Sequence, residues 1–460
     1  MTAAEIAAEV LAGRGRATDV LTACLGRIER LNPVLNAFTT VTTERARARA
    51  AALDEAIAAG ARPGPLAGVP FAVKNLFDIA GLPTLAGSKI NRDHPPAKAD
   101  APVVARLEAA GAILVGALNM GEYAYDFTGE NAHYGPSRNP FDTKRMTGGS
   151  SGGSGSAVGG GLVPLALGSD TNGSIRVPAS FCGLFGLKPT YGRLTRAGTF
   201  PFVSSLDHVG PLARSARDLA ASYDAMQGYD SADPVCVDRP AEPVSGLLDG
   251  GIAGLRVASA GGYFRAGASP EALAALDAIA MALGTTETIT IPEAQRARSA
   301  AYVITTTEGA ALHLERLHTR PNDFDADVRD RLIAGALVPA AAVVQAQKFR
   351  RWFREEMLRL FEHVDAILAP ATPVVAPLIG QKTFVLDGKE MPTRANIGLY
   401  TQPISFVGLP VVVVPVMTPL GLPIGVQIIT APWREDLALR IARYLEMSGA
   451  AGAPVPASEA

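Results

Sequence analysis

The chain has 460 residues, of which 48% are apolar, and its 42 Lys and Arg against 44 Asp and Glu give a net charge of −2. At roughly 150 residues per domain, this length allows up to three domains or one large α/β domain with a sizeable core. The balanced charge lacks the basic stripe that neutralises phosphates, which argues against direct binding of nucleic acid.

The first part of the chain alternates between helical and strand patterns. Apolar residues recur every three or four positions over residues 1–60, which predicts helices with Thr2 and Thr18 as N-caps. We predict a buried strand at 69–73 with Lys74 at its end, then a helix at 101–110 and a strand at 113–115. This alternation indicates a layered α/β fold.

A surface crossover at residues 228–250, rich in Pro and Asp, marks the main internal boundary. The elements predicted beyond it are a strand at 252–258, helices through 270–360, strands at 366–370, 409–416 and 424–429, and a helix at 437–445. The predicted division is an N-terminal helical segment that packs on the core (1–60), an α/β domain (61–449) and a flexible tail (450–460).

Cysteine usage and the N-terminus indicate the compartment. Cys24, Cys182 and Cys236 are odd in number and widely spaced, which fits neither a disulfide framework nor a zinc site. Residues 1–16 lack the apolar centre of a signal peptide, and no apolar run reaches about 18 residues without proline or charge. We therefore expect a cytoplasmic protein that does not interact with membranes.

The histidines do not predict a metal site. Of the six, only His313 and His318 lie close together in the sequence. Five residues along a helix turn a side chain by about 140°, so the two do not share a helix face. No metal is expected.

Residues 148–155 consist of glycine and serine alone, but the apolar run 162–167 follows closely, which is not typical of a linker. A P-loop needs Gly-Lys-Ser/Thr directly after the glycines, and there is no lysine between Lys144 and Lys188. The stretch also contains the Gly-x-Ser-x-Gly pattern of a nucleophile elbow, but loop-like residues precede it where that motif requires a strand. By itself, the stretch could still be a flexible loop without a chemical role.

A second small, polar turn lies at residues 169–180, after an apolar strand. A serine nucleophile needs a base, and no pattern positions a histidine to serve as one. A buried lysine can do so, because desolvation disfavours the ammonium form and lowers the pKa. Lys74, flanked by Val73 and Leu76, is such a candidate.

Three segments together resemble the amidase signature family. They are residues 68–74 (Gly-Val-Pro-Phe-Ala-Val-Lys), residues 148–155 and residues 170–180, in that order and spacing, within a similarity that spans residues 5–445. The resemblance implies amide hydrolysis on the family's α/β fold, in which helices flank both faces of a central mixed, twisted sheet.

The resemblance also implies a Ser-Ser-Lys triad. Ser174 matches the family's nucleophile, Ser150 the serine that relays its proton, and Lys74 the base. The relay serine follows a cis peptide bond, here Gly149–Ser150, and the nearby glycines allow that backbone path. The oxyanion hole would consist of the backbone N–H groups of Thr171, Asn172, Gly173 and Ser174. Attack on an amide would release ammonia, water would then hydrolyse the acyl-enzyme, and no cofactor is needed.

Asn172 departs from the family pattern, which usually has Gly-Gly before the nucleophile. Asn is the residue other than Gly that best tolerates positive φ. Either the turn merely tolerates Asn172, or its side chain contacts the substrate.

Asn172, residues 85–92 and residues 402–406 most resemble the subgroup of biuret-type hydrolases that act on 1-carboxybiuret in cyanuric acid breakdown. Such a substrate is small, planar and anionic, so its pocket should supply a cation. The candidate substrate-binding residues are Arg176, Arg316 and Arg320, together with His313, which matches another position of the subgroup. For each arginine the alternative is a structural salt bridge.

The main rival within the family is the glutaminase subunit of a tRNA-dependent amidotransferase. In those subunits an Asp holds the amino group of glutamine, and Gly398 takes that place here. Fatty-amide hydrolysis fits less well, because no membrane-binding helix starts the chain and Ala124 occupies part of the expected acyl channel. A non-catalytic anion-binding protein is a further alternative, but binding alone does not need a lysine that can lose its proton.

The resembled hydrolases and the glutaminase subunits both work with a small helical partner chain. We therefore expect this chain to bind such a partner subunit, with a homodimer or a dimer of heterodimers as the assembly. Its ligand should be a small anionic amide or ureide. The alternative is a chain that acts alone on generic small amides.

Overall fold

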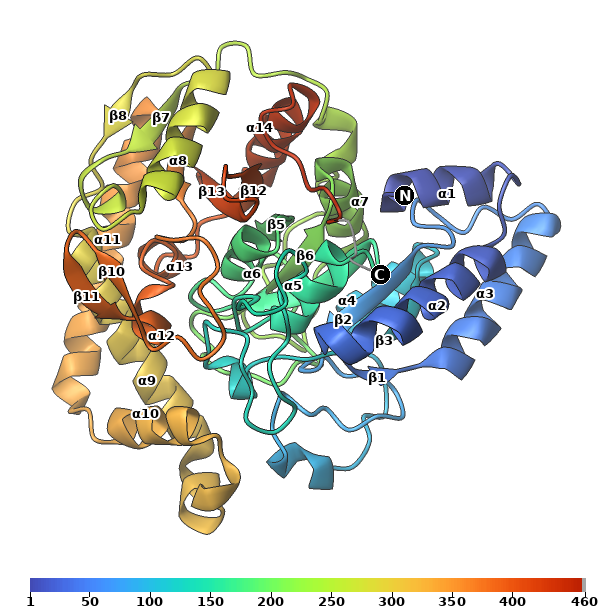
Figure 1. The fold of residues 1–460 in the computed structure, drawn as a ribbon, viewed down its shortest axis with the longest axis horizontal. Helices are drawn as coiled ribbons and strands as arrows, with labels where there is room; N and C mark the ends of the chain where they lie inside the picture. Colours follow the sequence, from blue (N-terminus) through green and yellow to red (C-terminus); the bar gives the residue numbers. More distant parts are fainter. Residues whose placement is uncertain (457–460) are drawn as a thin grey trace.

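The computed structural model describes residues 1–456, and its frame is an eleven-stranded mixed sheet (Figure 1). In order across the sheet, the strands are β1 (Phe38–Val41), β3 (Ile113–Leu118), β2 (Pro70–Lys74), β4 (Leu165–Asp170), β6 (His208–Ala213), β5 (Phe185–Lys188), β12 (Val411–Met417), β13 (Pro423–Thr430), β9 (Ala366–Pro370), β7 (Val257–Ala260) and β8 (Thr288–Ile289). Strand β2 runs parallel to β3 and β4, whereas β4 and β6 are antiparallel. A separate antiparallel hairpin joins β10 (Thr383–Leu386) to β11 (Lys389–Pro392).

Alternate residues of the central strands enter two different apolar cores. In β2, Phe71 and Val73 belong to one core and Ala72 to the other, because successive side chains of a strand point to opposite faces. Helices α4 (Pro102–Ala109), α7 (Ala216–Met226), α8 (Pro270–Ala282) and α14 (Glu435–Met447) cover the first face, and α2 (Ala17–Leu35), α3 (Thr43–Ala58), α5 (Gly152–Gly159) and α6 (Arg176–Phe181) cover the second. The prediction of a mixed sheet flanked by helices on both faces is confirmed.

The N-terminal segment differs in two details from its prediction. Thr2 caps α1 (Ala3–Leu11) in a capping box, as expected, but α2 begins after Arg16, so Thr18 lies inside the helix, where its hydroxyl donates to Asp54. The first sixty residues are also not all helical, since β1 pairs with β3 at one edge of the sheet. The β-branched residues 39–41 favour this strand, which the helical periodicity around it obscured.

The C-terminal half follows its prediction closely. Residues 228–250 contain only one short 3₁₀ turn, η3 (Ser245–Leu247), and β7 starts later than expected, at Val257. Strand β9 has its predicted bounds, and β12 and β13 pair antiparallel. Helices α9 (Ala294–Thr319), α10 (Ala326–Ala336) and α11 (Ala340–His363) form the side of the molecule opposite α1, α2 and α3 (Figure 1).

The tail has no regular secondary structure from residue 451 to residue 456, although Ala451 is buried and the Gly452 amide donates to the Pro415 carbonyl at 3.2 Å. Residues 457–460 of the predicted flexible tail lie outside the described residues. The division of the chain into segments 1–60, 61–449 and 450–460 stays a prediction.

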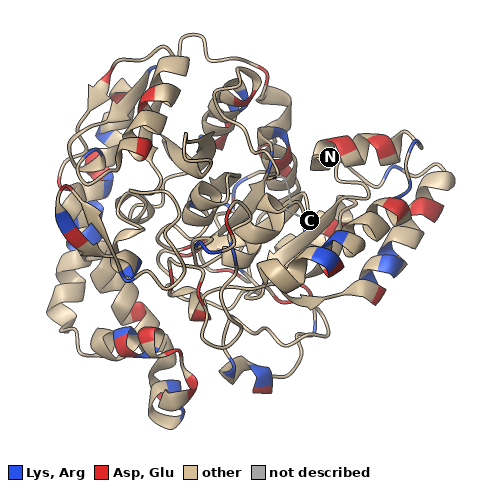
Figure 2. Ribbon diagram, in the orientation of Figure 1, with Lys and Arg blue, Asp and Glu red and all other residues tan. Residues whose placement is uncertain are grey.

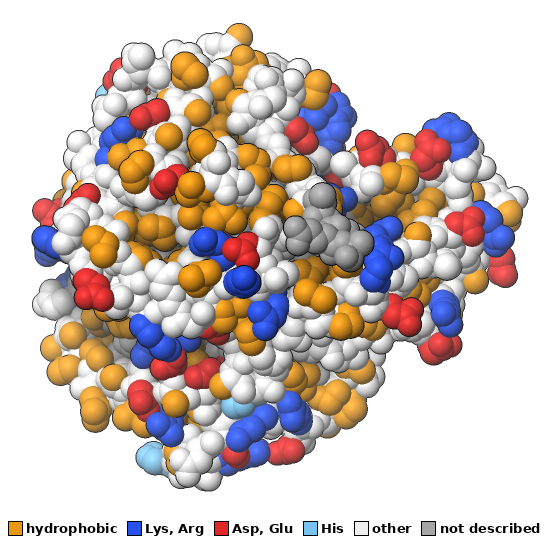
Figure 3. Space-filling view, viewed as in Figure 1, with side chains coloured by type: hydrophobic (Ala, Val, Ile, Leu, Met, Phe, Trp, Pro, Cys, Tyr) orange, Lys and Arg blue, Asp and Glu red, His pale blue; other side chains and the backbone are white. Residues whose placement is uncertain are grey.

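Both signs of charge occur on the surface helices. Lys and Arg lie on the same helices as Asp and Glu in several of them (Figure 2), and on the face seen in Figure 3 both signs lie among apolar side chains. Within residues 1–456, no single helix is long and apolar enough to cross a membrane. Among these residues, α10 and α11, which meet at a bend of 94°, have the length and apolar composition of a membrane span only when the two helices are counted together.

Candidate active site

Lys74 ends β2 and is wholly buried between β3 and β4. Its Nζ atom lies 2.6 Å from Ser150 Oγ and 2.8 Å from Ser169 Oγ. Burial lowers the pKa of Lys74 to about 7, although the negative charge of Asp170 and of more distant carboxylates opposes the shift. The amine can therefore be neutral near neutral pH and accept a proton, which is the state that a base requires.

Ser150 lies in the glycine-rich turn that leads into α5, and the Gly149–Ser150 peptide bond is cis, as the resemblance implied. A Cβ atom at Gly149 would collide with the Asp126 carboxylate, and one at Gly153 would lie 2.5 Å from the carbonyl oxygen of Asn119. These glycines let the backbone pass close to its neighbours. The stretch is therefore a tightly packed turn and the start of a helix, and the flexible-loop alternative is wrong.

Ser174 lies in the turn between β4 and α6. Asp170, at the end of β4, accepts hydrogen bonds from the amides of Ile175 and Arg176 at 3.2 and 3.4 Å, which fixes the turn from the inside. Gly173 has a φ of +141°, and a Cβ atom there would collide with Thr401. The residue in this turn that needs the conformational freedom of glycine is thus Gly173.

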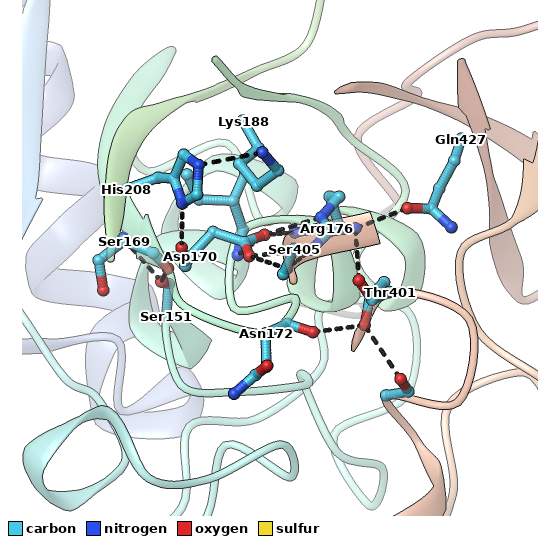
Figure 4. Close-up of polar contacts among 12 residues, drawn as sticks. Ser151, Ser169, Asp170, Asn172, Arg176, Lys188, His208, Thr401, Ser405 and Gln427 are labelled. Atoms are coloured by element: carbon cyan, nitrogen blue, oxygen red, sulfur yellow. Dashed lines mark hydrogen bonds and ion pairs between the residues drawn. The ribbon is translucent and has the colours of Figure 1, made fainter. Parts of the chain in front are cut away.

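Asn172 does not have positive φ. The tolerance of Asn for positive φ is therefore not what allows Asn172 in this turn, because the left-handed backbone falls on the next residue. Its backbone carbonyl accepts a hydrogen bond from Thr401 Oγ1 at 2.7 Å (Figure 4). That the turn merely tolerates Asn172, or that its side chain contacts the substrate, stays a prediction.

The same turn presents a row of backbone N–H groups. Those of residues 171–174 have no acceptor within the described part of the chain, whereas those of Ile175 and Arg176 donate to Asp170. Unpaired amides beside a nucleophile can stabilise an oxyanion. The role of residues 171–174 as the oxyanion hole stays a prediction.

A cavity of about 160 Å³ lies against this turn. Its wall is formed by the turn that carries Ser174, residues 124–127, Phe202, α9, α10, and the end of β11 with the segment that follows it. The lining residues are Ala124, Tyr125, Asp126, Phe127, Thr171, Asn172, Ser174, Phe202, Tyr302, Thr305, Arg331, Pro392, Arg394, Ala395 and Gln402. An amide held in this cavity would meet Ser174.

Arg176 is not part of the cavity wall and lies on the inner side of the turn (Figure 4). Its guanidinium donates to both carboxylate oxygens of Asp170, at 2.9 and 3.0 Å, and to Gln427 at 2.7 Å. Burial by itself would raise the pKa of Asp170, but the Arg176 guanidinium beside it holds that pKa well below its usual range. The structural salt bridge is the observed role, and the prediction that Arg176 binds substrate is wrong.

Arg320 and Arg316 also lie away from the cavity wall. Arg320 forms ion pairs with Asp93 at 2.7 Å and Asp323 at 2.8 Å, and its side chain is 37% exposed. The guanidinium of Arg316 lies over the ring of Phe200. Neither arginine shares the cavity wall with Ser174, and their roles as substrate ligands stay predictions.

His313 is fully buried among aromatic rings and does not line the cavity. Its ring centroid lies 4.1 Å from that of Tyr123, and Phe200 and Phe324 pack nearby. Burial lowers the pKa of His313 to about 3, so the imidazole is neutral at physiological pH. His313 was a candidate for binding substrate, and that role stays a prediction. Within residues 1–456, no group of three or more His, Cys, Asp and Glu is arranged to hold a metal ion.

Two cations that the sequence analysis missed do line the cavity, Arg331 on α10 and Arg394 after β11. Arg394 forms ion pairs with Asp126 at 2.8 Å and Asp327 at 3.2 Å. The guanidinium of Arg331 lies 3.9 Å from the ring centroid of Tyr125. Neither residue belongs to a recognisable motif, and the tertiary fold places both on the same cavity wall as Ser174.

Known proteins resemble this chain along nearly its whole length. It is 54% identical to AtzE of Pseudomonas sp. (strain ADP), a 1-carboxybiuret hydrolase subunit, over 98% of this chain and 99% of that protein. It is 39% identical to a subunit of the glutamyl-tRNA(Gln) amidotransferase of Methylococcus capsulatus (strain ATCC 33009 / NCIMB 11132 / Bath), over 96% of both.

Solved structures also match nearly the whole chain. One, described as a vestigial protein complex that reveals the evolutionary origins of an s-triazine catabolic enzyme, matches with a TM-score of 0.98 and 53% identity over 99% of this chain and 100% of that chain. The corresponding amidotransferase subunit of Thermotoga maritima matches with a TM-score of 0.81 and 30% identity over 96% of this chain and 95% of that chain. The amidase family model covers residues 19–439. With its buried lysine against a serine that follows a cis peptide bond, this chain belongs to the amidase signature family.

Proposed function

We propose that this chain hydrolyses a carbon–nitrogen bond of a small carboxylated ureide of the 1-carboxybiuret type and releases ammonia. One contact carries the chemistry, the 2.6 Å approach of Lys74 Nζ to Ser150 Oγ inside the core. The 54% identity to a 1-carboxybiuret hydrolase subunit supports the choice of substrate.

In the proposed reaction Lys74 acts as a neutral base. It takes the proton of Ser150, Ser150 takes that of Ser174, and Ser174 Oγ attacks the carbonyl carbon. The backbone N–H groups of residues 171–174 stabilise the oxyanion that forms. When the oxyanion collapses, the carbon–nitrogen bond breaks, and a proton returns through Ser150 to the leaving nitrogen, which departs as ammonia. Water then hydrolyses the acyl-enzyme and restores Ser174.

The carboxylate of such a substrate needs a cation, and Arg331 is the strongest candidate. Arg394 already shares its charge with Asp126 and Asp327. Arg331 instead donates to two backbone carbonyl oxygens, those of Tyr125 and Asp327, and forms no ion pair within residues 1–456. Its charge is therefore free to attract an anion into the cavity.

Glutamine is a weaker alternative substrate, because Gly398 and Phe127 leave no room for the carboxylate that would hold its amino group. A Cβ atom at Gly398 would lie 2.5 Å from Cζ of Phe127, which is part of the cavity wall. The phenyl ring thus occupies the volume that a side chain at position 398 would need. This contact argues against the glutaminase activity of an amidotransferase.

A small helical partner subunit is part of the proposal. The 54% identical relative is named as a subunit, and the matching structure is described as a protein complex. We expect a heterodimer, or a dimer of heterodimers, when the chain is purified from its native host and its mass is measured by light scattering. A homodimer or monomer that carries no second chain would contradict this part.

Ammonia release tests the activity itself. The substrates are 1-carboxybiuret, biuret, glutamine and simple primary amides, and the variants are Ser174→Ala and Ser150→Ala, each checked for native circular dichroism. We expect turnover of 1-carboxybiuret by the parent chain and a loss of at least about a thousandfold in both variants. Unchanged turnover in Ser174→Ala would exclude the nucleophile, and preference for glutamine would favour the amidotransferase alternative. A chain that binds the anion but releases no ammonia from any of them would favour the binding-protein alternative.

A further inference from the structure

The side chain of Asn172, two residues before the proposed nucleophile, has a buried oxygen without a hydrogen-bond partner within residues 1–456. Asn172 is only 6% exposed, and its Nδ2 atom donates to Thr305 Oγ1 at 2.9 Å. Its Oδ1 atom is buried and has no hydrogen-bond partner within the described residues. Leaving a buried carbonyl group unpaired is unfavourable, so such an atom is expected to acquire a partner when a ligand is present.

The position of this oxygen restricts what that partner can be. Asn172 and Thr305 both belong to the wall of the cavity that contains Ser174. Thr305, on α9, accepts the hydrogen bond from the side-chain nitrogen of Asn172. The side-chain oxygen of Asn172 is then the atom left to bind a ligand. A carbonyl oxygen accepts hydrogen bonds only, so the matching group on a substrate is an N–H or O–H donor close to the carbon that Ser174 attacks.

Ureides and simple carboxamides differ at this place. The carbonyl carbon of a ureide has nitrogen on both sides, one that leaves as ammonia and one that stays on the acyl group. The carbonyl carbon of a carboxamide has carbon on the second side and offers no donor there.

We propose that Asn172 is a specificity-determining residue that selects ureides over carboxamides by accepting a hydrogen bond from the nitrogen that stays on the acyl group. This inference rests on the proposed function and defines its substrate class. Ser174 Oγ bonds to the carbonyl carbon, the bond to the terminal nitrogen breaks, and ammonia leaves with the relayed proton. The carbamoyl-enzyme keeps its N–H against Asn172 Oδ1 until water releases the carbamate and Ser174 regains its proton.

A pair of isosteric probes tests the selectivity. N-carbamoylglycinate and succinamate both have a terminal primary amide and a carboxylate, and they differ only by NH or CH₂ beside the attacked carbonyl. The readout is the ratio of their kcat/KM values, which cancels any loss common to both probes. Asn172→Gly is the main variant, since the family usually has glycine there, and Asn172→Ala is the second.

We expect both variants to lower the ratio of kcat/KM for the ureide probe to kcat/KM for the carboxamide probe by about tenfold to a hundredfold. Thr305→Val removes the hydroxyl that accepts the hydrogen bond of Asn172 and should lower this ratio partly. Thr305→Ser keeps a hydroxyl there and should give the ratio of the parent chain. Thr307→Val is the matched control, because Thr307 is two residues along α9, bonds only to carbonyls of its own helix and does not line the cavity. It should leave the ratio unchanged.

The outcome separates this inference from the proposed function. If 1-carboxybiuret is hydrolysed but the ratio is the same in the parent chain, Asn172→Gly and Asn172→Ala, the role of Asn172 is overturned and the activity stands. If 1-carboxybiuret is not hydrolysed, the two probes are tested as inhibitors of the hydrolysis of a simple amide. The ratio of their inhibition constants, carboxamide probe over ureide probe, then replaces the ratio of their kcat/KM values. A ratio that falls in the Asn172 variants then supports the role of Asn172, and an unchanged ratio overturns it.

Discussion

The Nζ atom of Lys74 lies 2.6 Å from the Oγ atom of Ser150, and neither side chain is exposed to solvent. Because burial brings the pKa of Lys74 to about 7, the amine is protonated at lower pH and cannot accept the serine proton. We expect kcat/KM to rise tenfold per pH unit in acid and to level off above about pH 7. The pH profile of ammonia release checks this. A rise centred near the ordinary lysine pKa of about 10.4 would show that Lys74 is not a desolvated base.

Replacing Lys74 with Met should abolish activity and change how stability depends on pH. The folded-state pKa of Lys74 lies below the unfolded value, so the unfolded chain binds more protons between about pH 7 and about pH 10. The free energy of unfolding therefore gains a contribution that rises with pH across this window, and Lys74→Met lacks it. Urea denaturation of both proteins at several pH values measures the difference, which isolates Lys74 from other groups. Parallel curves for parent and variant would contradict the assigned pKa.

Burial alone does not identify the base, which shows where sequence reasoning reaches its limit. Lys188 is as buried as Lys74, and burial lowers its pKa to about 7 as well. Its Nζ atom lies 3.3 Å from His208 Nε2 (Figure 4) and donates to the carbonyl oxygens of Pro189 and Leu409. Within residues 1–456 it forms no hydrogen bond to a serine. The apolar neighbours of Lys74 and its place in the motif order of the resembled family indicated Lys74 as the base, and that role stays a prediction.

The fold was predictable because strand and helix patterns are local. Strand periodicity placed Lys74 at the end of β2, and the glycine-serine stretch containing Ser150 leads into α5. The triad came from the resemblance, and the catalytic roles of Lys74, Ser150 and Ser174 stay predictions. The rest of the cavity wall comes from α9, α10 and the segment after β11, which reach the site by packing of distant segments. Arg331 and Arg394 could therefore not be recognised, and the arginines chosen from local resemblance were those that form ion pairs elsewhere or pack on an aromatic ring.

Removing the charge of Arg331 should weaken the binding of anionic substrates. Arg331 lines the cavity and forms no ion pair with a carboxylate within residues 1–456. Arg331→Met is therefore expected to raise KM for 1-carboxybiuret by about tenfold to a hundredfold and to affect neutral amides less. Arg320→Met is the matched control, because Arg320 is exposed and paired with Asp93 and Asp323. Steady-state kinetics on charged and neutral amides measures both. A larger rise in KM for the Arg320 variant would restore the original prediction.

Arg176→Met should destabilise the protein without acting through the substrate carboxylate. The Arg176 guanidinium has no solvent exposure and donates to both oxygens of Asp170, whose carboxylate also holds the amides that follow Ser174. Removing one partner leaves a buried charge uncompensated, which costs about 3–5 kcal/mol of unfolding free energy. Arg176→Lys keeps the charge but loses the two-pronged contact, so its loss should be smaller.

The double variant Asp170→Asn/Arg176→Met tests the cause of that destabilisation. It removes the isolated charge while keeping one side-chain acceptor for the amides of Ile175 and Arg176. It should therefore recover part of the stability lost in Arg176→Met, as measured by urea denaturation. Catalysis should fall in all these variants through kcat, because the turn that carries Ser174 loses its internal support. If Arg176→Met instead raised KM for anionic substrates at unchanged stability, the guanidinium would be a substrate ligand and the buried pair with Asp170 would not be its main role.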